Sequence, residues 1–349
     1  MQPDRNMRAF QGFLVEARRY WMSDVWGALK DDYAQRAEGQ VIATSEDVAR
    51  VMATSPLYCY YAWLERHIQR AKYAGRWGLV PYFRDEMPAS ADAGRLRLDA
   101  AVPIPDYFKR VDIHQHPGNL TDGPGAGLVY KASAVSTQPG ATQGYGLHER
   151  FATFLEELGR FDRILDMGCG FGKSALPIAE RFGHATVKGV DLAAPCLTLA
   201  AVEATQQNVP NLAYEQADLR RTRYDDRSFD LVTSTMVLHE LDPPAVREAL
   251  AETYRLLEPG GTAVHLDFRV KDPFLEFIHY GHGRRNNEPY MEPLNEMDVE
   301  AELRAAGFVD VRTMPFEEAE GATARDWPTW RLPWTAFVAR RPAASEPQG

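Results

Sequence analysis

The chain has 349 residues, of which 45% are hydrophobic and 25% are charged, a composition typical of a globular protein. Its formal net charge of −10 argues against a nucleic-acid partner, because a nucleic-acid groove needs a basic surface. No apolar run reaches the ~20 residues of a membrane span, and the charged N-terminus lacks the apolar core of a signal peptide, so we expect a cytoplasmic protein without a membrane partner.

Residues 1–100 predict a helical auxiliary domain. In the stretch FQGFLVEARRYWMSDVWGALK (10–30), apolar and aromatic side chains recur at three- and four-residue spacing, which favours a helix. Thr44 or Ser45, followed by Glu46 and Asp47, is a helix-capping signal. Aromatic residues at this spacing usually form a core, but they could also cover an apolar substrate or form a homodimer interface.

Residues 101–147 differ from the helices before them. The segment is rich in glycine and proline and shows neither a helical nor a strand period. A long irregular segment inside a compact protein is usually a functional loop or a linker. We therefore expect it to connect two domains and to lie over the active site.

From residue 148 to residue 340, short apolar strands alternate with amphipathic helices. The strand candidates run from RILDMG (163–168) to WTAFVARRP (334–342). Alternation of this kind predicts an α/β fold with a Rossmann-like sheet of seven strands, mostly parallel, and helices on both faces. No helix separates the last two candidates, so the last strand should be antiparallel. Residues 341–349 should form a disordered tail.

The stretch LDMGCGFGKS (165–174) holds the most informative motif. A nucleoside-triphosphate loop needs a glycine at position 167, where Met167 stands, so this loop would have the wrong length. A dinucleotide loop needs its third glycine where Lys173 stands. The observed spacing is Gly168-x-Gly170-x-Gly172, and the motifs that follow decide between the ligands.

Three further motifs follow this loop in order: GVDL (189–192), ADL (217–219) and LLEPGG (256–261). Asp166 ends the strand just before the glycines. The ordered set resembles class I methyltransferases that depend on S-adenosyl-L-methionine (SAM), over residues 148–340. The resemblance implies SAM as the cofactor and S-adenosyl-L-homocysteine as the product.

The resemblance also assigns the cofactor contacts. Asp166 and Gly168 would line the methionine end, and Asp191 would hold the ribose hydroxyls. Asp218 would accept a hydrogen bond from the adenine amino group, although it and Asp191 could instead merely cap helices or turns. The residues predicted to bind the cofactor are Asp166, Gly168, Cys169, Gly170, Gly172, Asp191, Leu192, Asp218, Leu219, Thr233, Ser234 and Tyr145. Among these, Thr233 and Ser234 would face the sulfonium, and Tyr145 would close over SAM.

Two residues are candidates for the catalytic base. His239, in MVLHELDPP (236–244), resembles the histidine of a His–acid pair after the fourth strand in O-methyltransferases of natural-product biosynthesis. With an ordinary pKa near ~6.5, it could remove a substrate proton near neutral pH. The alternative is that it only packs against the following helix. Asp267 ends the fifth strand, on the side where open α/β sheets bind ligands.

Two histidine pairs and a polar run are candidates for substrate contacts. His114 and His116 occur in DIHQHPG (112–118), and His279 and His282 occur in FIHYGHG (277–283). Facing each other, and joined by Asp112 or Glu288, the four histidines could hold a metal ion. We favour polar substrate contacts for them and predict no metal site, because no third ligand is fixed by the sequence.

The run GRRNNEPYM (283–291) is predicted to be irregular and rich in hydrogen-bond donors. Arg284, Asn286 and Tyr290 would suit a substrate with a carboxylate or several oxygens. A solvated surface loop is the alternative for this run.

The sequence thus predicts methyl transfer from SAM to an oxygen or nitrogen, with carbon as a further acceptor, of a small molecule of the secondary-metabolite kind. Amide and DNA methyltransferases carry an NPPY-type signature after the fourth strand, and STMVLHE stands in its place here. One alternative is a SAM-binding relative that catalyses a metal-assisted or non-methylation reaction. Another is a non-catalytic scaffold that binds a partner through its N-terminal helices.

Overall fold

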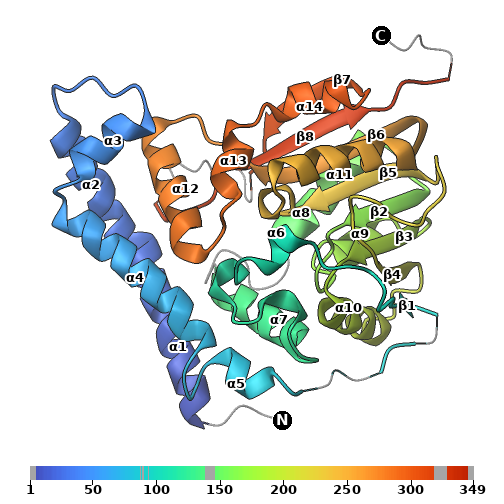
Figure 1. Ribbon diagram of the computed structural model, residues 1–349, viewed down its shortest axis with the longest axis horizontal. Coiled ribbons are helices and arrows are strands. Elements are labelled where there is room, and N and C mark those ends of the chain that lie inside the picture. The colour runs from blue at the N-terminus through green and yellow to red at the C-terminus, as the bar shows by residue number, and fades with distance from the viewer. Residues whose placement is uncertain are drawn as a thin grey trace.

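A mixed sheet of eight strands forms the centre of the protein (Figure 1). The computed structural model describes residues 5–86, 88, 90–92, 94–137, 146–317 and 328–344. The strand order is β1-β4-β3-β2-β5-β6-β8-β7, and only β8 runs antiparallel to its neighbours. The strands are β1 (Leu96–Arg97), β2 (Arg163–Met167), β3 (Thr186–Asp191), β4 (Leu212–Gln216), β5 (Phe229–Thr235), β6 (Leu257–Phe268), β7 (Val309–Pro315) and β8 (Trp334–Arg340).

The predicted fold class is confirmed, with one strand more than the seven expected. The additional strand, β1, lies within the segment predicted to be helical and pairs in parallel with β4 through Leu96 and Tyr214. A strand of two residues is too short to show an alternating pattern, so the sequence gives no signal for it.

The sheet carries a buried layer on each face because alternate side chains of a strand point in opposite directions. Ile164 of β2 packs in a cluster with Phe151 and Ile178, and the next residue, Leu165, packs in a second cluster with Leu250. A strand buried on both sides needs apolar residues on both faces, and Ile164, Leu165 and Met167 supply them in β2, with Asp166 as the buried polar exception.

Helices cover both faces of the sheet and form the N-terminal region (Figure 1). The α-helices up to the sheet are α1 (Arg5–Tyr20), α2 (Trp26–Ala37), α3 (Ser45–Met52), α4 (Pro56–Tyr73), α5 (Leu79–Phe83), α6 (Asp106–Lys109), α7 (Ala126–Thr137) and α8 (Gly146–Leu158). Those that follow are α9 (Ala175–Arg181), α10 (Ala194–Gln206), α11 (Pro243–Leu256), α12 (Pro273–Asn286), α13 (Met291–Glu296) and α14 (Val299–Ala305). Short turns of other helix types are η1 (Trp21–Val25), η2 (Ile113–Gln115), η3 (Asn119–Thr121) and η4 (Leu238–Glu240). Among the described helices, none is both long and apolar enough to cross a membrane.

The segment 101–147 is more regular than its composition suggests. It contains the 12-residue helix α7. A Cβ atom on Gly127 would lie 2.5 Å from the carbonyl oxygen of Pro195, so this glycine lets α7 approach α10 closely. Glycine therefore serves helix packing at this position, and not the irregular backbone that its abundance predicts.

Aromatic side chains join the N-terminal helices to α12. Trp21, Trp26 and Tyr61 are fully buried in one cluster with Phe274 of α12 and with Trp330. The Trp21 indole N–H donates to the carbonyl oxygen of Tyr61 at 3.0 Å. The spacing of these aromatics thus reflects a core, and this core includes residues from the C-terminal half of the chain.

A buried carboxylate adds a polar connection between α4 and α12. Glu65 is fully buried, accepts hydrogen bonds from Arg285 and Asn286, and pairs with His282. Burial alone would raise the pKa of Glu65, but the charges of Arg285 and His282 outweigh burial and hold that pKa well below its usual value. The carboxylate is therefore ionised at neutral pH.

We expect Glu65→Ala to lower the free energy of unfolding by about 3–5 kcal/mol, because it leaves the buried Arg285 guanidinium without its counter-charge. The measurement is equilibrium unfolding in urea. Glu292→Ala is the matched control, because Glu292 forms an exposed pair with Arg284 near the same end of α12. Its loss should cost at most about 1 kcal/mol. Equal losses for the two variants would contradict the buried connection.

Candidate active site

The carboxyl ends of four parallel strands bring acidic and polar side chains to one edge of the sheet. Asp166 of β2 and Asp191 of β3 lie near these ends, and Ser234 of β5 is in register with His265 of β6. Open α/β sheets bind ligands at this edge.

The glycine loop after β2 has a left-handed backbone at Gly168 (φ +71°), Gly170 (φ +52°) and Gly172 (φ +85°). A Cβ atom on Gly168 would lie 2.3 Å from a Val237 methyl group, and one on Gly172 would lie 2.6 Å from the Tyr214 hydroxyl. Protein side chains therefore fill the space beside these two glycines. At Gly170 the nearest atom to such a Cβ is a ring carbon of Tyr130, at 3.5 Å.

Asp191 fastens the glycine loop to the end of β3. Its carboxylate accepts hydrogen bonds from the Gly170 and Ala193 amides, both at 2.8 Å. Burial raises the pKa of Asp191 to about 6, although these hydrogen bonds oppose the shift. Each carboxylate oxygen has two lone pairs, so acceptor capacity remains for a ribose hydroxyl.

Asp166 has one oxygen that fits a cationic ligand. One of its oxygens accepts a hydrogen bond from Ser174, and the other is buried without a partner among the described residues. Burial and the nearby Asp191 raise the pKa of Asp166 to about 7, and the Ser174 bond opposes them. An unpaired buried acceptor is costly, and the ammonium group of a bound methionine moiety would supply the missing donor.

The predicted adenine contacts lie at the end of β4, where Asp218 already has a partner. Arg220 donates to its carboxylate through the guanidinium at 2.6–3.0 Å and through the backbone amide at 2.9 Å. An adenine amino group would have to share Asp218 with Arg220. Leu192 and Leu219, predicted beside the ring, are each 8% exposed.

Thr233 and Ser234 use their hydroxyl groups inside the sheet. Thr233 donates to the carbonyl oxygen of Val264, and the Ser234 hydroxyl pairs with Nδ1 of His265, both at 2.8 Å. These bonds join β5 to β6, so they provide no support for the predicted contact with the sulfonium. Tyr145 lies outside the described residues.

Tyr130 is an aromatic residue beside the glycine loop that is not among the residues predicted from the sequence. Its ring meets Phe171 edge-on, with centroids 5.3 Å apart, and stacks on His114 at 6.0 Å. The only sequence signal was an aromatic residue within 101–147, which equally indicated Tyr145. Its position against Gly170 depends on the packing of α7.

His239 and Asp267, the two candidate bases, are paired with each other. Nδ1 of His239 lies 2.8 Å from Asp267, and both side chains are buried. Asp267 also accepts from the amides of Val237, His239 and Phe268 at 2.8–3.3 Å. These bonds occupy both oxygens of Asp267, so it orients the imidazole and is badly placed to contact substrate itself. Burial lowers the pKa of His239, but the Asp267 charge and hydrogen bond outweigh burial and raise it.

His114 bridges two carboxylates from different parts of the chain. Nδ1 lies 2.9 Å from Glu288, and Nε2 lies 3.2 Å from Glu240. The backbone of His114 is left-handed (φ 57°), and its carbonyl oxygen accepts from Gln69 of α4. Burial lowers the pKa of His114, but the two carboxylates outweigh burial and raise it to about 10. The imidazole is therefore charged at neutral pH.

This raised pKa predicts a pH-dependent contribution to stability. The contribution is full below the ordinary value of 6.5 and is lost as the pH rises towards 10, because His114 binds its proton more tightly in the folded state. We therefore expect the difference in unfolding free energy between the wild type and His114→Gln to shrink from pH 6.5 to pH 9.5. Urea titrations across that range measure it, and a constant difference would contradict the charged bridge.

The four histidines have different hydrogen-bonding surroundings. His114 pairs with Glu240 and Glu288, and His282 pairs with Glu65. His116 and His279 are buried, and within the described ranges neither ring has a hydrogen-bond partner. In the part of the chain that the structure describes, no group of three or more His, Cys, Asp or Glu side chains could hold a metal ion.

The polar run 283–291 is partly helical, which corrects the prediction of an irregular loop. α12 continues to Asn286, which is buried and donates to Glu65, whereas Arg284 pairs with Glu292 at the surface. The Tyr290 hydroxyl donates to the carbonyl oxygen of Tyr107 at 3.3 Å. Arg284 is 69% exposed, so it is badly placed for a contact in a buried site.

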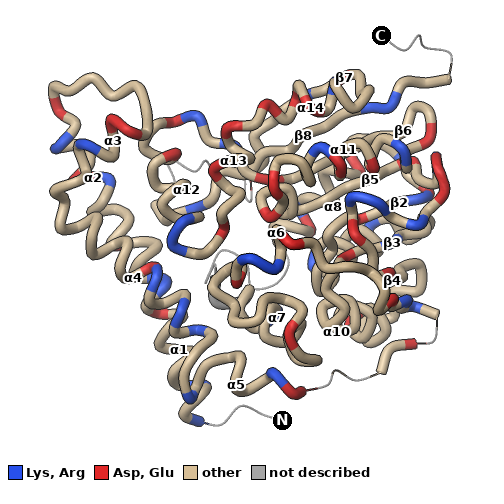
Figure 2. Tube along the Cα trace, in the orientation of Figure 1, with Lys and Arg blue, Asp and Glu red and all other residues tan. Residues whose placement is uncertain are grey.

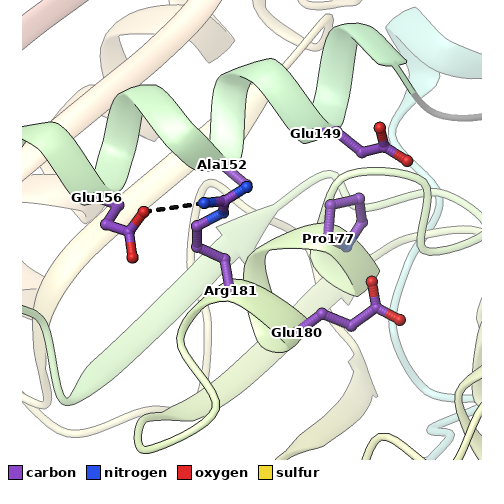
Figure 3. A pocket seen from close by; sticks show the side chains of 6 residues that line it. All are labelled: Glu149, Ala152, Glu156, Pro177, Glu180 and Arg181. Carbon is purple, nitrogen blue, oxygen red and sulfur yellow. Dashed lines mark hydrogen bonds and ion pairs between the residues drawn. The ribbon is translucent and has the colours of Figure 1, made fainter.

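A hollow of about 450 Å³ lies between α8 and α9, away from these residues (Figure 3). In it, Arg181 reaches Glu156 at 3.0 Å. The residues that line it are Glu149, Ala152, Glu156, Pro177, Glu180 and Arg181. None of them is a predicted site residue, and we assign the hollow no part in the reaction.

Comparison with known proteins identifies the family. A family model described as "Methyltransferase domain" matches residues 164–261. An uncharacterised methyltransferase of Synechocystis is 32% identical over 177 residues, which cover 49% of this chain and 80% of that protein. A probable methyltransferase of Aspergillus luteorubrus is 28% identical, with 57% of this chain and 75% of that protein covered. Phosphoethanolamine N-methyltransferase 1 of Arabidopsis thaliana is 31% identical, with 43% of this chain and only 29% of that protein covered. The strand order of the sheet and the glycine loop after β2 agree with these matches. The chain belongs to the class I SAM-dependent methyltransferases, whose cofactor is SAM.

Proposed function

We propose that this protein transfers the methyl group of SAM to an oxygen or nitrogen atom of a small molecule, with His239 as the general base. The observation that carries the proposal is the position of the His239–Asp267 pair beside the glycine loop. Val237 lies against Gly168, and its amide donates to the same Asp267 carboxylate that orients His239. Val237 contacts the glycine loop and lies two positions before His239 in the sequence. The candidate base is therefore held close to the cofactor loop.

Bound SAM supplies an electrophilic methyl group, so the protein has mainly to place the acceptor atom in line with it. A hydroxyl or protonated amine must also lose a proton during the transfer. With Nδ1 of His239 bonded to Asp267, Nε2 presents a lone pair for that proton. We assign Asp166 to the methionine end, Asp191 to the ribose and Gly170 to the loop surface that faces the cofactor.

His279 supports a polar acceptor molecule on the same side. The rings of His279 and His239 both contact the ring of Phe268, with centroids 5.5 Å and 4.7 Å away. Burial lowers the pKa of His279 to about 3, so the ring is neutral and carries one donor and one acceptor. A substrate hydroxyl or amine would give one of these two nitrogens a partner. One relative is named for N-methylation of phosphoethanolamine, which supports nitrogen as well as oxygen as the acceptor.

Two alternatives from the sequence have less support. A partner-binding scaffold does not need an oriented His–Asp pair buried beside an intact glycine loop. A metal-assisted reaction would need a cluster of ligands, and the described residues offer no such cluster. The acceptor could also be an activated carbon, and the experiment below distinguishes that case.

The test is methyl transfer from isotope-labelled SAM to a panel of phenols, carboxylic acids and amines, with the products identified by mass spectrometry. The proposal predicts a labelled O-methyl or N-methyl product with the wild type and a greatly reduced yield with His239→Gln. A C-methylated product would correct the acceptor class. Full activity of His239→Gln would show that His239 is not the general base.

A further inference from the structure

Glu240 is a carboxylate beside the candidate base that no step of the proposed reaction uses. It is the last residue of η4, the short turn after β5 that also carries His239. The amides of Val237 and His239 donate to Asp267 of β6, so this turn is fastened to the sheet. η4 packs against α13, and Figure 2 shows several Asp and Glu positions around α13 and α6. The backbone of Glu240 therefore has a fixed place next to His239.

A chain of contacts leads from Glu240 to the glycine loop. Nε2 of His114 is 3.2 Å from the Glu240 carboxylate, whose side chain is 16% exposed. The ring of His114 stacks on that of Tyr130, with centroids 6.0 Å apart. A ring carbon of Tyr130 is in turn 3.5 Å from the place of a Cβ atom on Gly170. The partly buried carboxylate thus belongs to the surroundings of the glycine loop.

The charge of Glu240 acts on both ends of the proposed reaction site. Burial raises the pKa of Asp191, and the negative charge of Glu240 adds to that rise. Burial lowers the pKa of His239, whereas the charges of Asp267 and Glu240 raise it. Interactions between charges weaken with distance. A single carboxylate is therefore close to the residue assigned to the ribose and to the candidate base.

Glu288 occupies the opposite nitrogen of the same imidazole. Nδ1 of His114 lies 2.9 Å from the Glu288 carboxylate. The charge of Glu288 acts on Lys72 and Tyr73, at the end of α4. His114 thus pairs with one carboxylate on the side of the cofactor loop and with another on the side of the N-terminal helices.

We propose that Glu240 is a specificity-determining residue that favours the cationic cofactor SAM over its neutral product, S-adenosyl-L-homocysteine (SAH). The inference rests on the proposed function, which assigns the ribose to Asp191 and the general base to His239. The sulfur of SAM is one carbon atom away from the ribose ring, and its methyl group must point towards the acceptor beside the base. The sulfonium therefore belongs between these two residues, near the Glu240 carboxylate.

The charge on the sulfur is the difference that Glu240 can detect. SAM carries a positive sulfur and SAH a neutral one, whereas the adenine, the ribose and the amino-acid end are the same in both. A nearby carboxylate attracts the positive sulfur, and this attraction is screened less in a partly buried site than at the surface. The charge of His114 offsets part of the attraction, so we expect a preference of moderate size.

The test is calorimetric titration of the purified full chain with SAM and with SAH. Glu240→Gln should lower the ratio of SAM affinity to SAH affinity by at least about fivefold, mainly through weaker binding of SAM. Glu240→Ala also removes the charge and should change the ratio in the same direction. Glu240→Asp keeps the charge and should retain most of the preference of the wild type. An unchanged ratio in the two neutral variants would overturn the proposal.

Glu288→Gln is the matched control, because it removes a carboxylate from the other nitrogen of His114. It should lower the thermal stability, since it weakens the same bridge, but leave the ratio of the two affinities largely unchanged. An equal fall of the ratio in Glu288→Gln and Glu240→Gln would assign the effect to the bridge and overturn the proposal. A wild type that does not bind SAM would overturn the proposed function as well, whereas an unchanged ratio in Glu240→Gln overturns this inference alone.

Discussion

His239→Gln should lower kcat for methyl transfer by roughly 10²–10⁴-fold, the usual contribution of a general base. The amide of glutamine can fill much of the space of the imidazole and can donate to Asp267, but it cannot take a proton from the substrate. SAM affinity should stay within a few-fold of the wild type, because no cofactor contact is assigned to this side chain. Single-turnover rates with labelled SAM, together with calorimetric affinity, measure the two effects separately.

Asp267→Asn tests the same pair through the pH profile. In the wild type, kcat/KM should rise with pH as His239 loses its proton, with a midpoint above 6.5, because Asp267 raises the pKa of His239. Without the negative charge, burial lowers that pKa, so the rising limb should move to lower pH while the plateau rate falls. His265→Gln is the matched control, since His265 is buried on the same strand but pairs with Ser234. If the rising limb of kcat/KM lies at the same pH in Asp267→Asn as in the wild type, Asp267 does not raise the pKa of the catalytic base.

Gly168→Ala should weaken SAM binding and lower the free energy of unfolding by about 2–4 kcal/mol. A left-handed backbone costs an alanine about 1–2 kcal/mol, and a Cβ atom 2.3 Å from Val237 forces further movement. Because Val237 also donates to Asp267, the displacement would reach the His239 pair. Urea unfolding and calorimetric titration with SAM measure the losses.

Gly170→Ala is the control for the steric part of this effect. Its backbone is also left-handed, but its Cβ atom would contact only Tyr130 at 3.5 Å. The free energy of unfolding of Gly170→Ala should therefore fall by about 1–2 kcal/mol, the backbone cost alone. In the double variant Gly168→Ala/Val237→Ala, the removed methyl groups should restore part of the stability. If that variant is no more stable than Gly168→Ala, the clash with Val237 is not the cause.

The sheet and the glycine loop could be predicted from the sequence because their signals are local. An apolar run such as RILDM and the spacing of Gly168, Gly170 and Gly172 can be read within ten residues. Neither depends on what packs against it. β1 could not be predicted, because its signal is not local. Its two residues form a strand only because β4 lies beside them.

The arrangement of the site could not be predicted, because it depends on contacts between distant residues. His239 and Asp267 were separate candidates until the pairing of β5 with β6 placed them together. His114 lies 126 positions before Glu240 and 174 before Glu288, so its bridge has no local pattern. The position of Tyr130 could not be predicted, because the glycine and proline residues around α7 gave no sign that this segment is a helix.

The most direct test of the account is calorimetric titration of the purified protein with SAM, NAD⁺ and ATP in parallel. These are the ligands of the three loops that the glycines of residues 168–172 could have formed. The account predicts saturable binding of SAM at one site per chain, weakened at least about tenfold by Asp191→Ala, which removes the ribose contact and the fastening of Gly170. NAD⁺ and ATP should give no binding heat. Binding of either nucleotide in place of SAM, or no SAM binding at millimolar concentration, would contradict it.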